Sequence, residues 1–263
     1  SEEDIPKVVG RISFFVNAGI RFVEEMCKMR AFTELWDRIT QQRYGVSDAA
    51  LRRFRYGVQV NSLGLTEPQP ENNILRIVLE MLGVTLSKDA RCRALQLPAW
   101  NEALGLPRPW DQQWSLRAQQ ILAFESDLLE YDDIFNGSRV IEAKVKEMVE
   151  AAEREIQDIE ARGGVVEAVE SGYLKQHLVE SNAQRLRAIE SGEQIVVGVN
   201  KFTETAENPL TKDLDTAILT IEAQVEQEAV AAIKKWRSGR DAGAVSTALA
   251  RLRDAVRKGE NIM

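Results

Sequence analysis

The stretch that decides the fold is Arg11-Ile-Ser-Phe-Phe-Val-Asn-Ala-Gly19, a short apolar run with a long amphipathic segment directly after it. Residues 11–16 combine apolar and β-forming side chains, and residues 17–19 end the run, which predicts a buried strand and its turn. From Ile20 to about Gln42, apolar side chains recur every three or four positions and charged ones fill the opposite face. This spacing predicts a helix that covers the strand.

The same unit of strand and helix recurs twice. Residues 54–60 and 93–97 read as strands, while residues 72–82 and 112–126 read as helices. The alternation predicts parallel strands joined by right-handed crossovers, as in a (β/α) barrel. Closing a barrel usually takes about eight strands. Either further strands lie outside this chain, or the sheet is open with helices on both faces.

A different pattern begins near residue 138. Charged amphipathic helices are predicted over 138–162, 165–171, 173–191, 211–236 and 244–258, with glycines where several of them end. One strand-like run, Ile195 to Val199, interrupts them. We therefore expect an α/β part over residues 1–131 and a helical linker or docking part over residues 132–263.

The composition excludes several classes of function. A hydrophobic content of 44% and a charged content of 29% are typical of a soluble globular protein. The formal charge of −7 argues against a nucleic-acid partner. The acidic start and the lack of a long apolar run argue against a signal peptide and a membrane span, so a cytoplasmic location is expected.

Few residues have the spacing of a catalytic or metal site. Cys27 and Cys92 are far apart and lack a zinc or redox pattern, so reduced structural thiols are expected. His177 is the only histidine, which excludes a His-His metal site within one chain and favours a structural role. Neither Gly-rich phosphate-binding pattern occurs, so nucleotide hydrolysis has no support.

A first candidate site is the set Arg11, Ser13 and Phe15. Because alternate positions of a strand share one face, a cation, a hydroxyl and an aromatic ring would point the same way. Such a site is expected at the C-terminal end of barrel strands, where loops converge. The alternative is that Ser13 and Phe15 fill the barrel lumen while Arg11 pairs with a carboxylate.

A second candidate is the loop after the third strand, where Trp100, Asn101 and Glu102 put an amide and a carboxylate among apolar residues. Burying such a pair costs free energy unless it binds something, so a ligand contact and a structural role are both open. Residues 61–71 are too many for a tight connection and form a further candidate loop.

Several blocks, in order along the chain, resemble the adenosylcobalamin-dependent acyl-CoA mutases, the family of methylmalonyl-CoA mutase. They are Arg11 to Ala18, Pro70-Glu-Asn-Asn-Ile74 and Ile195-Val-Val-Gly-Val-Asn-Lys-Phe202. Segments 86–90, 96–103, 107–114 and 124–131 are similar to the ethylmalonyl-CoA branch of that family. Arg93 and Gln96 stand where the methylmalonyl-CoA branch has Gln and His, a departure that would reshape the acyl pocket.

The resemblance implies a piece of a mutase, namely the C-terminal strands of a (β/α)8 TIM barrel followed by the helical linker. The family's catalytic histidine and its cobalamin-binding domain would lie outside residues 1–263, so this chain alone is expected to be inactive. The implied activity is that of an isomerase, a radical rearrangement of ethylmalonyl-CoA to methylsuccinyl-CoA. The alternatives are a mutase for another branched acyl-CoA, such as methylmalonyl-CoA, and a non-catalytic subunit that docks a cobalamin-binding partner.

The resemblance also assigns residues. It implies contact with the acyl-CoA substrate for Arg11, Ser13, Phe15, Gln59 and Arg93, and contact with the adenosylcobalamin cofactor for Glu102, Ala103 and Leu106. The implied partners are the remaining barrel strands, a cobalamin-binding domain or subunit, a G-protein chaperone and, in the complete enzyme, a second copy as a homodimer.

Overall fold

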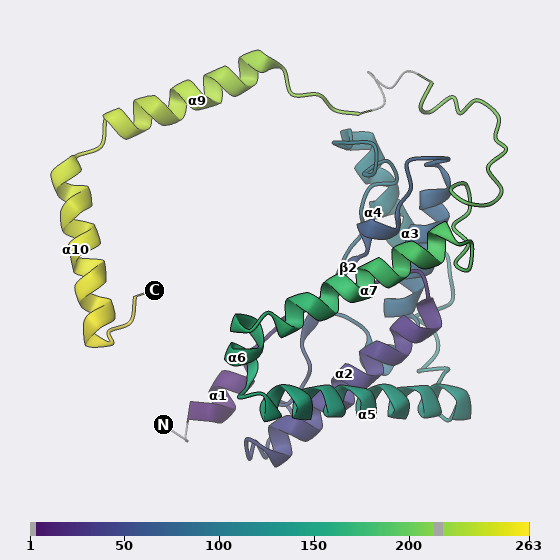
Figure 1. The fold of residues 1–263 in the computed structure, drawn as a ribbon, viewed down its shortest axis with the longest axis horizontal. Helices are drawn as coiled ribbons and strands as arrows, with labels where there is room; N and C mark the ends of the chain where they lie inside the picture. The colour runs from purple at the N-terminus through teal and green to yellow at the C-terminus, as the bar shows by residue number, and fades with distance from the viewer. Residues whose placement is uncertain (1–3, 213–217, 263) are drawn as a thin grey trace. The chain divides into compact units, whose positions relative to one another are not determined.

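The computed structural model describes residues 4–212 and 218–262. Its sheet has three parallel strands in the order β1 (Phe14–Ala18), β2 (Tyr56–Val60) and β3 (Ala94–Gln96). Helix α2 (Phe22–Gln42) connects β1 to β2, and α3 (Asn72–Thr85) connects β2 to β3 (Figure 1). The predicted alternation of parallel strands and helices is therefore confirmed for this part of the chain.

The first strand was predicted three residues too early. Arg11 and Ile12 belong to the end of the short helix α1 (Ile5–Val9), because their backbone N–H groups donate to the Val8 carbonyl at 2.9 and 3.2 Å. Backbone groups that complete a helix turn are not available to a sheet ladder. Pairing with β2 therefore starts at Phe14, opposite Tyr56.

The helices that pack on the sheet cover one of its faces. Successive strand residues point to opposite faces, and Tyr56 and Val58 are buried in a cluster with Met29 of α2 and Val84 of α3. A neighbouring cluster around Val60 joins α3 to α4 (Pro109–Phe124). The opposite face is open in the described residues, so the alternative with helices on both faces is not observed there.

Helix α5 (Arg139–Ala161) packs on α2 and shares its core. The buried residues of this contact are Met26, Cys27, Ala31 and Leu35 from α2 with Ile141, Val145 and Val149 from α5. The chain just before α5 is also held, because Asp133 Oδ2 accepts from Ser87 Oγ at 2.6 Å and from Arg30 Nη1 at 3.0 Å. The first helix of the expected linker is thus continuous with the core of the α/β part.

Helices α6 (Val165–Glu170) and α7 (Tyr173–Glu190) follow α5. Each is preceded by a glycine with positive φ, +96° at Gly164 and +77° at Gly172. Glycine adopts this conformation without the steric cost that a Cβ brings. The helix breaks predicted at these glycines are confirmed.

The predicted strand over residues 195–199 is wrong. These residues form a turn in which Val197 and Lys201 make one isolated bridge. Gly198 has a φ of +81°, and the Asn200 side chain accepts from the Val196 N–H and donates to the Gln194 carbonyl, both at 2.8 Å. A left-handed glycine and an asparagine that bonds its own backbone favour a turn over an extended strand.

The described residues from 220 to 262 make a second compact unit, with helices α9 (Ala223–Ser238) and α10 (Ala242–Lys258). The helix predicted over 211–236 is wrong at its start, since residues 218–222 are not helical and residues 213–217 lie outside the described residues. The helix predicted over 244–258 is confirmed. Throughout residues 4–212 and 218–262, no helix combines the length and the apolar character that a membrane span requires.

Candidate functional site

The open face of the sheet presents two rows of side chains in register. Phe15, Gly57 and Ala94 are paired across the three strands and form an apolar row. Two residues further along, Asn17, Gln59 and Gln96 are paired in the same way and form an amide row. Both rows point away from the helices, because they alternate with the buried positions of the strands.

The apolar row is shaped by a glycine. Phe15 is 62% exposed, and its ring lies over Gly57, where a Cβ would come within 3.0 Å of two ring carbons. A side chain on Gly57 would therefore displace the ring. Phe15 and Gln59, two of the predicted substrate contacts, do share this face.

Arg11 and Ser13 lie at the opposite end of β1 from the expected one. Both are exposed and precede the strand, so they stand at its N-terminal end. The expectation of a cluster at the C-terminal strand ends is therefore wrong for these two residues. The prediction overlooked that the turn of α1 takes up Arg11 and Ile12. The candidate residues therefore extend along β1, from Ser13 through Phe15 to the amide row. They do not gather at the C-terminal edge of the sheet.

The loop after β3 is anchored by Asp111. Its carboxylate accepts from Trp100 Nε1 at 3.0 Å, from Asn101 Nδ2 at 2.8 Å and from Arg108 Nε at 2.9 Å. Burial of Asp111 would raise its pKa, but these hydrogen bonds to the ionised form lower it below the ordinary value. Trp100 and Asn101 are thus buried structural residues of this loop, and sequence spacing alone did not reveal their partner Asp111.

The same anchored loop exposes the three predicted cofactor contacts. Glu102 and Ala103 are exposed, and Leu106 is 50% exposed. Loops that follow parallel strands gather at the C-terminal edge of a sheet. A carboxylate and two apolar side chains therefore face outward from a fixed turn at that edge.

A buried polar hub ties this loop to α3. Asn73 is fully buried, and its Nδ2 donates to the carbonyls of Thr66 and Trp100, both at 2.9 Å. Its Oδ1 accepts from Arg76 Nη1 at 2.7 Å, and Arg76 Nη2 donates to the Val197 carbonyl at 2.8 Å. The loops after β2 and β3 and the turn at residues 195–202 are therefore held together by two residues of one helix.

Glu80, also on α3, is buried with only 1% of its surface exposed. Within the described residues its Oε2 has no hydrogen-bond partner. Burial, reinforced by the charge of Glu25 and opposed by Arg76, raises the pKa of Glu80 to about 8. The carboxyl group is therefore mostly protonated at neutral pH.

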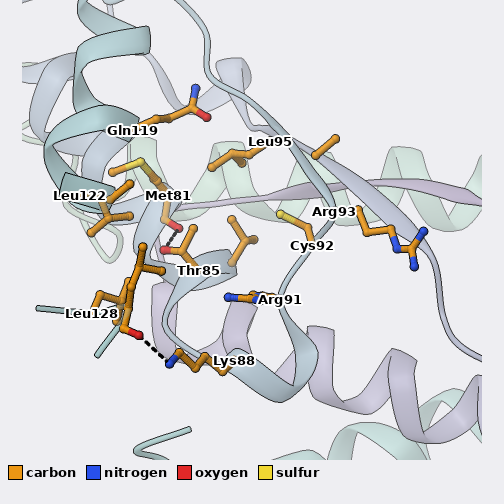
Figure 2. Close-up of a pocket in the computed structure, with 14 residues that line it drawn as sticks. Met81, Thr85, Lys88, Arg91, Cys92, Arg93, Leu95, Gln119, Leu122 and Leu128 are labelled. Atoms are coloured by element: carbon orange, nitrogen blue, oxygen red, sulfur yellow. Dashed lines mark hydrogen bonds between the residues drawn. The ribbon is translucent and has the colours of Figure 1, made fainter. Parts of the chain in front are cut away.

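Arg93 lies at the other end of β3, beside a cavity of about 260 Å³. Its N–H donates to the Tyr56 carbonyl at 2.9 Å, and Figure 2 shows its guanidinium directed away from Leu95 and Leu122, which line the cavity. Burial raises the pKa of Cys92, on the cavity wall, to about 11, so this thiol stays protonated. The structure brings Gln96 next to Gln59, and it does not bring Arg93 there.

No group of three or more metal-ligating side chains occurs in the described part of the chain. His177 lies on the exposed side of α7, with its ring centroid 4.3 Å from that of Tyr173. The candidate site therefore consists of the open sheet face and the Glu102 loop.

Comparison with known proteins gives consistent matches along the whole chain. The model of the methylmalonyl-CoA mutase family matches residues 3–263. Ethylmalonyl-CoA mutase from Methylorubrum extorquens is 65% identical over 262 residues, which is 100% of this chain and 38% of the relative. Ethylmalonyl-CoA mutase from Cereibacter sphaeroides is 62% identical over 261 residues, covering 99% of this chain and 40% of the relative.

A methylmalonyl-CoA mutase from Escherichia coli is 32% identical over 254 residues, which is 96% of this chain and 34% of the relative. The chain therefore spans at most about two fifths of the length of these curated relatives. The two relatives whose names specify ethylmalonyl-CoA are about twice as similar to this chain as the one whose name specifies methylmalonyl-CoA.

Proposed function

The chain belongs to the methylmalonyl-CoA mutase family, and from this we propose that it forms part of an isomerase that converts ethylmalonyl-CoA to methylsuccinyl-CoA. One observation carries the choice of substrate. Identity is 62% and 65% to the two ethylmalonyl-CoA mutases, against 32% to the methylmalonyl-CoA mutase of Escherichia coli. The reaction rearranges the carbon skeleton of the acyl group.

The proposed architecture is the C-terminal part of a (β/α)8 barrel over residues 1–131 and a helical linker over residues 132–263. Parallel strands with their helices on one face support it, since the inner face of a barrel carries no helices. The open face would then be a wall of the barrel lumen. The shared core of α2 and α5 supports a linker whose first helix packs on the outside of this proposed barrel.

The acyl-CoA would lie along this open face. Arg11 and Ser13 at the start of β1 would meet the phosphate-bearing part of the molecule, for which a guanidinium is well suited. Phe15 would cover the middle, and Gln59 would face the acyl end. The distance along the strand from Ser13 to the level of Gln59 is four residues, or roughly 13 Å, which suits a long narrow ligand. An apolar row along this path would keep water away from the reacting atoms.

The Glu102 loop fits the cofactor that the family resemblance implies, adenosylcobalamin. Its carboxylate is exposed on a turn that Asp111 holds in place, and Ala103 and Leu106 expose apolar surface beside it. Glu102 would accept hydrogen bonds from the ribose hydroxyls, and Ala103 and Leu106 would lie against the corrin. When bound, the cofactor supplies the radical that removes a hydrogen atom from the substrate.

Reconstitution of the full-length protein tests this function. The purified protein is mixed with adenosylcobalamin, a cobalamin-binding partner where that domain is separate, and either ethylmalonyl-CoA or methylmalonyl-CoA. Formation of methylsuccinyl-CoA, with a higher kcat/KM for ethylmalonyl-CoA, is expected. A higher kcat/KM for methylmalonyl-CoA would favour that substrate, and binding of the partner without turnover of either thioester would favour a docking subunit.

A further inference from the structure

The amide row is one level of the sheet built from three different strands. Asn17 pairs with Gln59, and Gln59 pairs with Gln96, so the three Cα atoms lie side by side across β1, β2 and β3. Neighbouring strands are about 4.8 Å apart, which gives the row a width of roughly 10 Å. It is the last fully paired level before the C-terminal edge of β3, from which the Glu102 loop leaves.

The three amide side chains are available to a ligand. Asn17 and Gln96 are exposed, Gln59 is half-buried, and none of the three side chains makes a hydrogen bond with other described residues. The hydrogen bond that Asn17 makes with a described side chain uses its backbone carbonyl, which accepts from Lys28 Nζ at 2.9 Å. Each amide offers both donors and an acceptor without carrying charge.

The adjoining apolar row limits where a polar group of a ligand can be placed. A ring, a glycine and a methyl group make no hydrogen bonds through side chains, so a carbonyl oxygen lying there would lose its water without replacement. One level further on, the amide row can supply that hydrogen bond. The change from apolar to amide side chains thus fixes how deep the polar end of an extended ligand sits.

We propose that Asn17 and Gln96 flank Gln59 and bind the thioester end of the acyl group, so that Gln96 and Asn17 are specificity-determining contacts. This inference rests on the proposed function. Neutral amide donors suit a neutral thioester carbonyl oxygen, whereas a carboxylate is better served by the charged fork of an arginine. The acyl group and its side branch would then lie beyond the amide row, towards the C-terminal edge of β3 and the Glu102 loop.

The test uses the full-length protein with Gln96→Met and Asn17→Leu, which keep side-chain size and remove the amide. Gln96→Glu keeps the shape, replaces the N–H donors by acceptor oxygens and adds a negative charge. Gln112→Met, an exposed amide on α4, is the matched control. Calorimetry measures binding of ethylmalonyl-CoA and of free CoA to each protein, and steady-state kinetics give KM and kcat/KM for ethylmalonyl-CoA and methylmalonyl-CoA.

Gln96→Met and Asn17→Leu are each expected to weaken binding of ethylmalonyl-CoA and to raise KM about two- to tenfold, through the loss of one neutral hydrogen bond. Gln96→Glu should weaken binding at least as much, because it also places a charge beside the neutral thioester. Binding of free CoA, which lacks the thioester, should be unchanged, and the ratio of kcat/KM between the two substrates should shift. The Gln112→Met control should match the wild type in every measurement. Because both row side chains lie outside the core, the unfolding midpoints should also stay at the wild-type value.

Unchanged ethylmalonyl-CoA binding and selectivity in an active wild-type background would overturn the inference and leave the proposed function standing. Equal weakening of free CoA and ethylmalonyl-CoA, or a lowered unfolding midpoint, would overturn it too, because the row would then act on the sheet and not on the thioester. Absence of acyl-CoA binding and turnover in the wild type would instead remove the proposed function itself.

Discussion

Replacing Glu80 by glutamine should make the protein more stable at neutral pH. The carboxyl group is buried on α3 with a pKa of about 8, whereas its ordinary value is 4.5. In the native state the group therefore keeps its proton up to about pH 8, while the unfolded chain loses that proton above about pH 4.5. Native stability consequently falls as the pH rises from 4.5 to 8 and then levels off.

The size of the effect follows from the shift. One pKa unit corresponds to about 1.4 kcal/mol, so between pH 4.5 and pH 7 the native state loses on the order of 3 kcal/mol relative to the unfolded chain. Glutamine has the same shape and no proton to lose, so the Glu80→Gln variant escapes this loss. In a protein of this size 1 kcal/mol moves the unfolding midpoint by about 2 to 4 °C.

Circular dichroism melts from pH 5 to pH 9 measure the difference. The melting curves of wild type and Glu80→Gln should lie close together near pH 5 and separate by several degrees at pH 8. Glu34→Gln, an exposed glutamate on α2, should follow the wild type throughout. Parallel pH profiles for Glu80→Gln and the wild type would refute the reasoning, because Glu80 would then titrate alike in the folded and unfolded states.

Three further outcomes are expected. In the complete enzyme, Glu102→Ala should lower cofactor affinity about tenfold to a hundredfold through loss of a charge-assisted hydrogen bond, and equal affinity by titration would remove that assignment. Asp111→Ala should lower the unfolding free energy by about 3 kcal/mol or more, since Trp100, Asn101 and Arg108 lose their shared acceptor, and chemical denaturation measures this. Residues 1–263 alone should bind neither adenosylcobalamin nor ethylmalonyl-CoA tightly, because they present only one open wall to the ligands. Tight binding measured by calorimetry, or turnover near that of the full-length enzyme, would contradict this.

The order of strands and helices could be predicted because apolar periodicity records it locally. Residues 20–42 and 72–82 have helical spacing, and α2 and α3 follow it closely. Periodicity could not give the start of β1, since the backbone of Arg11 and Ile12 is taken by the last turn of α1. It also failed at residues 195–199, where a valine-rich run is bent by Gly198 and Asn200.

The candidate site was predictable in part for a similar reason. Phe15 and Gln59 share a face, but spacing along one strand could not show that Gln96 stands beside Gln59, because pairing between strands depends on register. Asn17 follows Ser13 and Phe15 at the same two-residue spacing in the sequence and so lies on the same strand face. This spacing could have added Asn17 to the set of candidate site residues. The role of Asp111 could not be recognised, since Trp100 and Asn101 lie eleven and ten residues upstream and meet it only after the loop folds back.

The packing of α5 on α2 has a consequence for how a gene of this kind can be divided. A split of the reading frame near residues 131–138, where the sequence pattern changes, would separate Met26 and Leu35 from Ile141 and Val149. Each polypeptide would then expose an apolar surface that is prone to aggregation. A split near residue 219 would fall between the two compact units instead. Natural gene fission should therefore occur after the helices that share the α2 core. Two subunits that result from a split before α5 should need to be produced together to remain soluble.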